Sequence, residues 1–412
     1  MAAHFQAHRS STATAPGKAI LFGEHAVVYG FTAIAACASD LRVRVDVAPC
    51  SSPGLHAAFA GGVSQSVDAA ALLGALQTSG CDAGEALTRA PARPSAALCA
   101  ALSALVTVQD PSIVQALVPL LFLSASILLR RGSGSSRGSG ASPGLRLSVR
   151  SEGLPIGAGL GSSAAVSVAA AAALLRAAGA IGQGTAVVVA GSSGRRPDAA
   201  ALELINGWAY ASEVIFHGTP SGIDNSVSTH GGMVTFTKGE GMKRLARPAA
   251  APPLRVLVTN TRVPRSTSAL VGAVRELRAA LPHVTNRIFD AIEAVVAESL
   301  AVLRGGGDSL AELARLMTIN HSLLQAVGVS HPALEEVCAA MGAAGLAGTK
   351  LTGAGGGGCA ITLLVEGGPS PQPACAALEA RGYECFETEL GGEGVLLLLG
   401  GGEEGAAAQS KL

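Results

Sequence analysis

The sequence predicts an α+β protein of two lobes that join near residue 232. Strand-like and helix-like segments are mixed along the 412 residues, without the regular strand–helix–strand repeat of a parallel sheet. Each half of the chain carries a glycine-rich loop beside an apolar segment, at 157–161 and at 353–358, and the chain changes character after Gly231. These observations favour lobes at 1–231 and 232–402, followed by a flexible tail at 403–412.

The composition excludes several classes of protein. Lys plus Arg and Asp plus Glu are each 29, so the formal net charge is 0, which argues against a nucleic-acid partner. Apolar residues make up 49%, enough to build a core and too many for a wholly disordered chain. The most apolar stretch, 113–129, contains Gln115 and Pro119 and is shorter than the ~20 residues of a membrane span. It predicts a buried helix, and no membrane partner is expected.

In the first lobe, segment 15–30 predicts a strand, a turn and a short helix. Alternating apolar and polar residues predict strands, while helical spacing or alanine-rich composition predicts helices. The expected strands are 41–47 and 145–150, and the expected helical regions are 55–130, 162–178 and 200–216. Two loops are expected where Gly and Ser are concentrated, at 131–144 and 191–198.

The second lobe follows the same rules. Strands are expected at 254–258, 360–365 and 394–399, and helices at 267–303, 308–327, 332–344 and 372–381.

The first glycine loop reads Gly157-Ala158-Gly159-Leu160-Gly161-Ser162-Ser163, between an expected strand and an expected helix. It lacks the Lys of the Walker P-loop and the 1, 3, 6 glycine spacing of the Rossmann fingerprint. Glycines nevertheless let backbone N–H groups approach a phosphate, and a helix N-terminus favours an anion. The two serines can cap the helix, contact a phosphate or ligate Mg²⁺. The alternative is a tight turn with a serine N-cap, and the loop alone does not decide between them.

The second glycine loop, 353–358, contains four consecutive glycines before an apolar strand. Ordering such a run is entropically costly, so it indicates that something comes close to the backbone. A flexible linker is the alternative, and the ordered look of the flanking segments argues against it.

Polar residues in two other segments are candidates for a site. Lys18 lies in an apolar strand-like stretch, and Glu24 and His25 follow a glycine turn. Glu213 lies at the end of an expected helix, and Asp224 opens the next element after a Pro-Ser-Gly turn. Each has an ordinary structural explanation, such as a solvent-directed lysine, a packed histidine or a carboxylate N-cap. Both carboxylates can nevertheless face one cleft.

Five segments together resemble the GHMP small-molecule kinases, and within them the members that phosphorylate mevalonate: PGKAILFGEHAVVYG, PIGAGLGSSAAVSV, HGTPSGIDNSVSTHGG, TNTRVPRST and KLTGAGGGGCAITLL. The resemblance covers about 13–400, without 131–144, 191–198 and the tail. It implies a first lobe like domain 2 of ribosomal protein S5, a ferredoxin-like second lobe, and an active site in the cleft between them.

The resemblance implies ATP- and Mg²⁺-dependent phosphorylation of the C5 hydroxyl of (R)-mevalonate, in the isoprenoid and sterol precursor pathway. Residues 157–163 would wrap the ATP phosphates, and Ser163 and Glu213 would hold Mg²⁺. Asp224 would take the hydroxyl proton, with Lys18 beside it and the γ-phosphate. Three further residues would lie toward the substrate: Glu24, His25 and Thr267. One departure from the family is Val166, where animal members commonly carry tyrosine, and the adenine contacts within 50–110 are not located.

Two alternatives remain open. The chain could act on another substrate of the family, namely phosphomevalonate, galactose or homoserine. It could also be a non-catalytic sensor, which predicts loss of Lys18, Glu213 or Asp224, and all three are present. The family also suggests a homodimer and feedback inhibition by prenyl diphosphates.

The sequence ends in Ser410-Lys411-Leu412. This tripeptide is an address read by the peroxisomal import receptor when it lies at a free C-terminus. We therefore expect a peroxisomal location, with a cytoplasmic one as the alternative.

Overall fold

The computed structural model describes residues 3–5, 9–78, 87–91, 93–131, 144–189, 192–218, 220–248, 251, 253–305 and 310–398. The helices within these ranges are α1 (Ala69–Thr78), α2 (Ala96–Ser103), α3 (Pro111–Leu128), α4 (Ser162–Ala177), α5 (Ala199–His217), α6 (Ile223–His230), α7 (Thr267–Ala280), α8 (Pro282–Gly305), α9 (Leu310–Ala326), α10 (Pro332–Ala343) and α11 (Gln372–Glu379), with short 3₁₀ turns η1 (Ala26–Tyr29) and η2 (Ala60–Gly62).

The strands fall into one small ribbon and one large sheet. The ribbon pairs β1 (Ala3–Phe5) with β6 (Leu129–Arg131). The remaining described strands form a single sheet: β2 (Ser11–Phe22), β3 (Thr32–Cys50), β4 (Leu55–Phe59), β5 (Ser64–Val67), β7 (Gly144–Glu152), β8 (Thr185–Val189), β9 (Ser192–Arg196), β10 (Met233–Thr237), β11 (Gly241–Leu245), β12 (Leu254–Asn260), β13 (Thr349–Leu351), β14 (Cys359–Leu364), β15 (Glu384–Leu390) and β16 (Leu396–Leu398). Its main path is β13-β14-β12-β15-β3-β2-β16-β9-β8, with β10 and β7 also pairing with β3.

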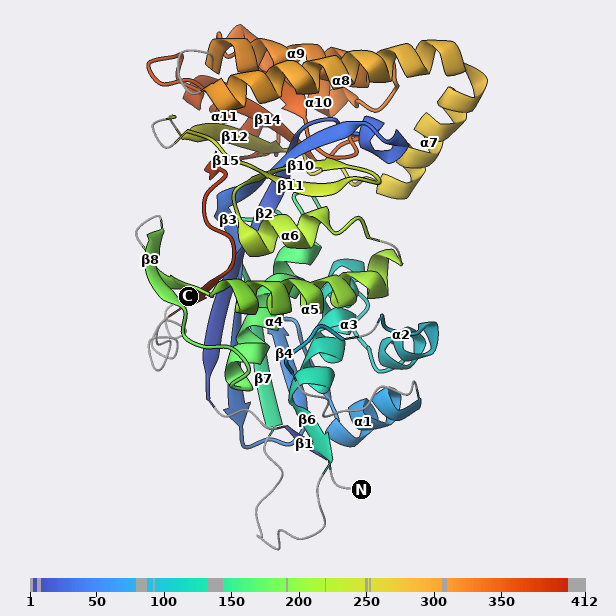
Figure 1. Cartoon of the computed structure of the whole chain (residues 1–412), viewed down its shortest axis with the longest axis vertical. Coiled ribbons are helices and arrows are strands. Elements are labelled where there is room, and N and C mark those ends of the chain that lie inside the picture. The colour runs from blue at the N-terminus through green and yellow to red at the C-terminus, as the bar shows by residue number, and fades with distance from the viewer. Residues whose placement is uncertain are drawn as a thin grey trace, which may run out of the picture.

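The predicted α+β architecture with two lobes is confirmed, but one sheet runs through both lobes. The long antiparallel strands β2 and β3 run through the molecule, with β12–β15 and α8–α11 at one end and α1–α5 at the other (Figure 1). One half of β3 pairs with β10 and the other with β7, and Leu390 of β15 pairs with Ala38. The sequence indicated only 41–47 as strand, because the half of β3 before Asp40 is buried on both faces and does not alternate.

Three expected elements differ from the structure. The region 55–130 is not helical throughout, because β4 and β5 precede α1 and form a hairpin beside β7. Residues 192–196, within the segment expected to be a loop, form β9 between β8 and β16. The helix expected at 267–303 is two helices, α7 and α8. Pro282 begins α8, where its missing N–H costs no hydrogen bond. The Gly/Ser loop expected at 131–144 falls mostly outside the described residues, apart from Arg131 and Gly144.

Helix α4 occupies the centre of the first lobe. It contacts β2, β3, α3, α5 and α6, and the helix from Ala164 to Ala177 is buried except at Arg176. Its run of alanines lets neighbouring elements approach closely, because a methyl side chain fills little space. The N-terminus of this helix, where the first glycine loop ends, is therefore held by the core on several sides.

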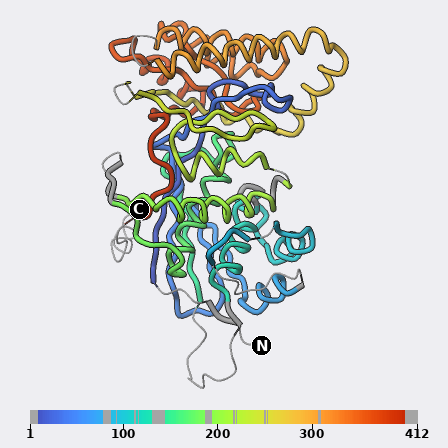
Figure 2. The backbone as a smooth tube through the Cα atoms, viewed as in Figure 1, coloured from blue at the N-terminus to red at the C-terminus, as the bar shows by residue number. Residues whose placement is uncertain are grey.

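The last described residues return from the second lobe to the first. In Figure 2 this segment runs back along the β2–β3 pair, and β16 pairs with β2 between Leu396 and Thr14. Arg42 on β3 holds the returning chain: its guanidinium donates to the carbonyls of Gly394, at 2.6 Å, and Glu393, at 3.3 Å. Burial lowers the pKa of Arg42 to about 10.

Helix α3 covers the stretch 113–129 that was expected to be buried, except Leu129, which begins β6. Leu120, Leu121 and Leu123 have no exposed surface, which confirms the expectation of a core helix. Among the described residues, no helix has the length and apolar character needed to cross a membrane.

Candidate active site

Three glycines shape the loop between β7 and α4. Gly157, Gly159 and Gly161 have φ angles of 74°, 88° and 71°, which residues other than glycine rarely adopt. The loop is fastened to β2, because the backbone N–H of Lys18 donates to the carbonyl of Leu160 over 2.7 Å. The loop does lie between a strand and a helix as expected, but the serine N-cap of the alternative explanation is wrong, because Gly161 is the N-cap.

The N-terminus of α4 forms an anion-binding geometry at the end of this loop. Gly161 is the N-cap, and Ser162 and Ser163 open the helix without an acidic residue in its first turn. Ser162 Oγ accepts a hydrogen bond from the Gly157 N–H at 3.3 Å, which folds the loop back onto the helix. Unpaired N–H groups and the helix dipole favour a negative group at such a position.

Lys18 and Asp224 form an ion pair beside that helix terminus. Nζ of Lys18 lies 3.2 Å from Oδ1 of Asp224. A Cβ on Gly161 would lie 3.0 Å from Cγ of Lys18 and 3.8 Å from Oδ2 of Asp224, so the pair borders the loop directly. Lys18 is 6% exposed. The side chain of Asp224 is 42% exposed, so its carboxylate can be reached from solvent.

Helix α6 fixes the position of Asp224. Ser228 Oγ donates to the carbonyl of Pro16 over 2.6 Å, which ties α6 to β2. Asn225 Nδ2 donates to Oδ1 of Asn206 over 2.6 Å, which ties it to α5. The carboxylate is thus carried on a short helix that Asn225 and Ser228 anchor to the neighbouring elements.

Ser163 and Glu213 meet at the same end of α4. Ser163 Oγ donates to Oε1 of Glu213 over 2.7 Å, and Ser167 Oγ donates to the same oxygen over 3.0 Å. Glu213 is buried, at 3% exposure. The structure therefore brings together the serine and the glutamate that were predicted as a metal pair. Among the described residues, no group of three or more His, Cys, Asp or Glu side chains is arranged to hold a metal ion.

Arg265 is a site residue that the sequence analysis missed. Its side chain runs between the two glycine loops. A Cβ on Gly159 would coincide with its guanidinium, and one on Gly358 would lie 3.0 Å from its Nε. Its Nη1 is buried and makes no hydrogen bond in the structure. Burial lowers the pKa of this guanidinium, and the nearby Cys359 and Asp224 act in the opposite direction. Arg265 could have been found from the TNTRVPRST segment that carries the family resemblance, from which only Thr267 was taken as a site residue.

The second glycine loop packs against the protein's own side chains. Gly355 to Gly358 all have positive φ angles. A Cβ on Gly356 would lie 2.8 Å from Leu270, and one on Gly357 would lie 2.7 Å from Val263. The expectation of a close approach to this backbone is confirmed, and what approaches is Val263 before α7, Leu270 in α7 and the carbonyl of Val329.

The residues expected toward the substrate lie in three different environments. Both side-chain oxygens of Glu24 are occupied, by Lys350 and Asn320, and the side chain has no exposed surface, so the structure does not bring it to the cleft. His25 Nε2 donates to the carbonyl of Ala354 in the second glycine loop over 2.8 Å, and burial lowers the pKa of His25. Thr267 is exposed at the first position of α7.

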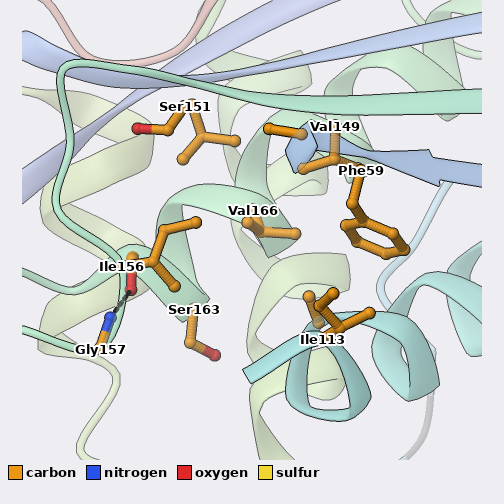
Figure 3. Close-up of a pocket in the computed structure, with 12 residues that line it drawn as sticks. Phe59, Ile113, Val149, Ser151, Ile156, Gly157, Ser163 and Val166 are labelled. Carbon is orange, nitrogen blue, oxygen red and sulfur yellow. Dashed lines mark hydrogen bonds between the residues drawn. The ribbon is translucent and has the colours of Figure 1, made fainter. Parts of the chain in front are cut away.

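A mainly apolar pocket adjoins the phosphate loop (Figure 3). Its walls come from β3, β4, β7, α3 and α4, and its mouth carries Gly157, Ser162 and Ser163. The apolar residues around it are Val43, Phe59, Ala60, Ile113, Ala116, Val149, Ile156 and Val166. A flat aromatic group fits such a lining. Val166 is smaller than the tyrosine that animal members of the resembled family commonly carry here, so part of the pocket stays open.

Known protein families share this arrangement. The family model described as GHMP kinases N terminal domain matches residues 121–232, and the one described as GHMP kinases C terminal matches 291–384. The first match contains the phosphate loop, Glu213 and Asp224. The chain belongs to the GHMP kinase family, which confirms the resemblance found in the sequence.

Two relatives within that family are mevalonate kinases. Mevalonate kinase of Homo sapiens is 37% identical over 393 residues, covering 93% of both chains. Mevalonate kinase of Arabidopsis thaliana is 36% identical over 404 residues, covering 93% of this chain and 98% of the relative.

Solved structures agree in fold. Leishmania major mevalonate kinase in complex with R-mevalonate matches with a TM-score of 0.64 at 23% identity, over 95% of this chain and 98% of that one. Methanococcus jannaschii mevalonate kinase matches with a TM-score of 0.66 at 21% identity, over 92% and 98%.

The crowding at Gly159 leads to a testable prediction. Gly159→Ala places a methyl group on the Arg265 guanidinium and at a φ of 88°, so the loop must shift. We expect nucleotide affinity to fall about tenfold, the equivalent of ~1.4 kcal/mol, measured by titration calorimetry with ATP. Gly182→Ala, where a Cβ meets nothing within 4 Å, is the control. Unchanged affinity in Gly159→Ala would contradict the geometry described for the loop.

Proposed function

We propose that this chain transfers the γ-phosphoryl group of ATP to the C5 hydroxyl of (R)-mevalonate, forming 5-phosphomevalonate. The observation that carries the proposal is the Lys18–Asp224 pair at the anion-binding N-terminus of α4. The names of the relatives supply the substrate, and the reaction is an early step toward isoprenoids and sterols. A sensor without activity would not need this pair.

Asp224 acts as the general base in this proposal. Its carboxylate is partly exposed, so it can accept the proton of a bound primary alcohol as the oxygen attacks phosphorus. Lys18 lies 3.2 Å away and places its positive charge where negative charge builds up on the transferred group. Phosphoryl transfer depends mostly on such positioning and charge stabilisation, since the protein forms no covalent bond.

The phosphate loop and the apolar pocket would bind different parts of the nucleotide. Backbone N–H groups of residues 157–163 would hold the phosphates, and the pocket lined by Phe59 and Ile113 would take the adenine ring. The buried Nη1 of Arg265, which lacks a hydrogen-bond acceptor, is suited to a phosphate oxygen beside Gly159.

Mg²⁺ fits the donors present beside this loop. Ser163 Oγ and Glu213 Oε1 are hard oxygen donors that lie 2.7 Å apart, so both could contact one ion. Mg²⁺ commonly keeps phosphate and water ligands, so two protein oxygens suffice. When bound, the ion would neutralise charge on the ATP phosphates, and Ser163 and Glu213 would hold it in place.

Three further proposals rest on the sequence and the family resemblance alone. A homodimer and feedback inhibition by prenyl diphosphates follow from the resemblance. Peroxisomal import follows from Ser410-Lys411-Leu412, which lies outside the described residues.

The base assignment is tested by Asp224→Asn, which removes the proton acceptor and keeps the shape of the side chain. With Mg-ATP and mevalonate, we expect kcat to fall about 10²- to 10⁴-fold while ATP binding persists. Asp290→Asn, at an exposed position of α8, is the control and should retain wild-type turnover. Near-wild-type kcat in Asp224→Asn would rule out the carboxylate as the base.

The metal assignment is tested by Glu213→Gln, which weakens a hard anionic ligand. We expect the Mg²⁺ concentration for half-maximal turnover to rise about tenfold or more, and the enhancement of ATP affinity by Mg²⁺ to shrink. Glu203→Gln, on the exposed face of the same helix, is the control. If Mg²⁺ still enhances ATP affinity fully in Glu213→Gln, the glutamate is not a ligand.

The location is tested with a fluorescent protein that carries the last ten residues of the sequence. We expect punctate fluorescence that coincides with a peroxisomal marker, and a diffuse signal when Leu412 is removed. Diffuse fluorescence from the intact fusion would refute import and favour the cytoplasmic alternative.

A further inference from the structure

A fully buried ion pair joins β13 to the turn that follows β2. Nζ of Lys350 on β13 contacts Oε1 of Glu24, and neither side chain has any exposed surface. Lys350 also donates to the carbonyl of Leu351 over 2.6 Å. Burial lowers the pKa of Lys350, and the carboxylate of Glu24 opposes that effect. Breaking one partner of such a pair leaves an uncompensated charge in the core.

Helix α9 completes the surroundings of the pair. Asn320 Nδ2 donates to the second oxygen of Glu24 over 3.0 Å. The neighbouring His321 accepts the backbone N–H of Leu351 at its Nδ1 over 3.3 Å. The second lobe therefore holds Glu24 from a strand and from a helix, and both of its oxygens are fixed.

The same strand end grips the chain at two further points. Thr352 Oγ1 accepts the N–H of Ile20 at 3.0 Å and donates to the carbonyl of Ile20 at 2.9 Å. His25 donates to Ala354. Residues 350–354 thus contact segment 20–25 at three points, and this segment begins two residues after Lys18.

The backbone at His25 is strained. Its φ is 60° and its ψ is −47°, a conformation that a residue with a Cβ adopts only when its surroundings enforce it. The enforcement comes from both sides: Glu24 is held by the buried pair, and the His25 ring is held by Ala354. Strain of this kind concentrates at functional sites, where it fixes a side chain in one place.

We propose that Lys350 is a positioning residue for phosphoryl transfer, which acts through Glu24 to hold His25 and the segment after Lys18 at the acceptor side of the cleft. This inference rests on the proposed function. The nucleotide side is built from other elements, since the phosphate loop is carried by β7 and α4. Loosening the buried pair should therefore impair mevalonate binding far more than ATP binding.

A purely structural pair makes a different prediction. Replacing both charges of a buried pair by neutral groups of similar size often costs little stability, whereas removing one charge costs much. The double variant Glu24→Gln/Lys350→Met separates the two explanations, because it removes the charges together while keeping side chains of similar length.

The experiment compares wild type, Lys350→Met and the double variant in thermal melting and in steady-state kinetics with mevalonate and ATP. We expect Lys350→Met to melt well below wild type and the double variant to recover most of that loss. In the double variant we expect KM for mevalonate to remain raised about tenfold or more, with KM for ATP changed less than about threefold.

Arg42→Met is the control, because Arg42 is a buried cation whose hydrogen bonds go to other segments, namely to Thr14, Ser39, Glu393 and Gly394. It should melt lower with both KM values unchanged. Asn320→Ala keeps the ion pair and removes one donor to Glu24, so it tests the proposal if the double variant does not fold. We expect it to raise KM for mevalonate selectively, by a smaller factor.

Two outcomes overturn the proposal. The first is a wild-type KM for mevalonate in the folded double variant, or in Asn320→Ala if the double variant does not fold. The second is an equal rise in the KM for mevalonate and the KM for ATP. Either result would mean that the pair has a structural role only. Failure of the wild type to phosphorylate mevalonate would instead contradict the proposed function, and the two failures are therefore distinguishable.

Discussion

The close approach of three chain segments at the N-terminus of α4 is the constraint on which the rest of the structure depends. A Cβ on Gly17 would lie 2.7 Å from the carbonyl of Leu160, and Gly161 leaves room for Lys18. Gly358 leaves room for Arg265 and for Ala158, because a Cβ on Gly358 would lie 2.7 Å from the carbonyl oxygen of Ala158. Glycine is required at these contacts because any side chain would separate the strand, the phosphate loop and the second loop.

The continuous sheet holds these segments in register across both lobes. Lys18 on β2 and the loop after β13 are far apart in the sequence, yet Thr352 hydrogen-bonds Ile20 of the same strand as Lys18. The hydrogen bond from Ser228 on α6 to the carbonyl of Pro16 ties the helix that carries Asp224 to the strand that carries Lys18. The reacting groups are thus fixed relative to one another by the backbone pairing of β2 and β3, by the bond from Lys18 to Leu160, and by the side-chain bonds that anchor α6.

The sequence was sufficient for the parts of the site that depend on local order. The phosphate loop, the serine after it and the carboxylates at 213 and 224 lie within single strand–helix or helix–turn–helix units, where spacing and residue type limit the geometry. Their grouping in one cleft came from the family resemblance.

Long-range contacts were beyond the sequence. Glu24 and Lys350 are 326 positions apart, and no periodicity connects them, so a carboxylate that is buried and paired looks the same as one that meets a substrate. Arg265 was missed for the same reason, because its neighbours Gly159 and Gly358 come from distant segments. The strand half before Asp40 was missed because burial on both faces removes the alternation that identifies a strand.

The most direct test of this account is ADP release by the purified chain with Mg-ATP, compared across mevalonate, 5-phosphomevalonate, galactose and homoserine. The account predicts turnover with mevalonate and none above background with the other three. Turnover with a different acceptor would leave the phosphate loop and the Lys18–Asp224 pair in place and contradict the assignment of the substrate. A folded protein that binds ATP and phosphorylates none of the four would contradict the catalytic reading of the site.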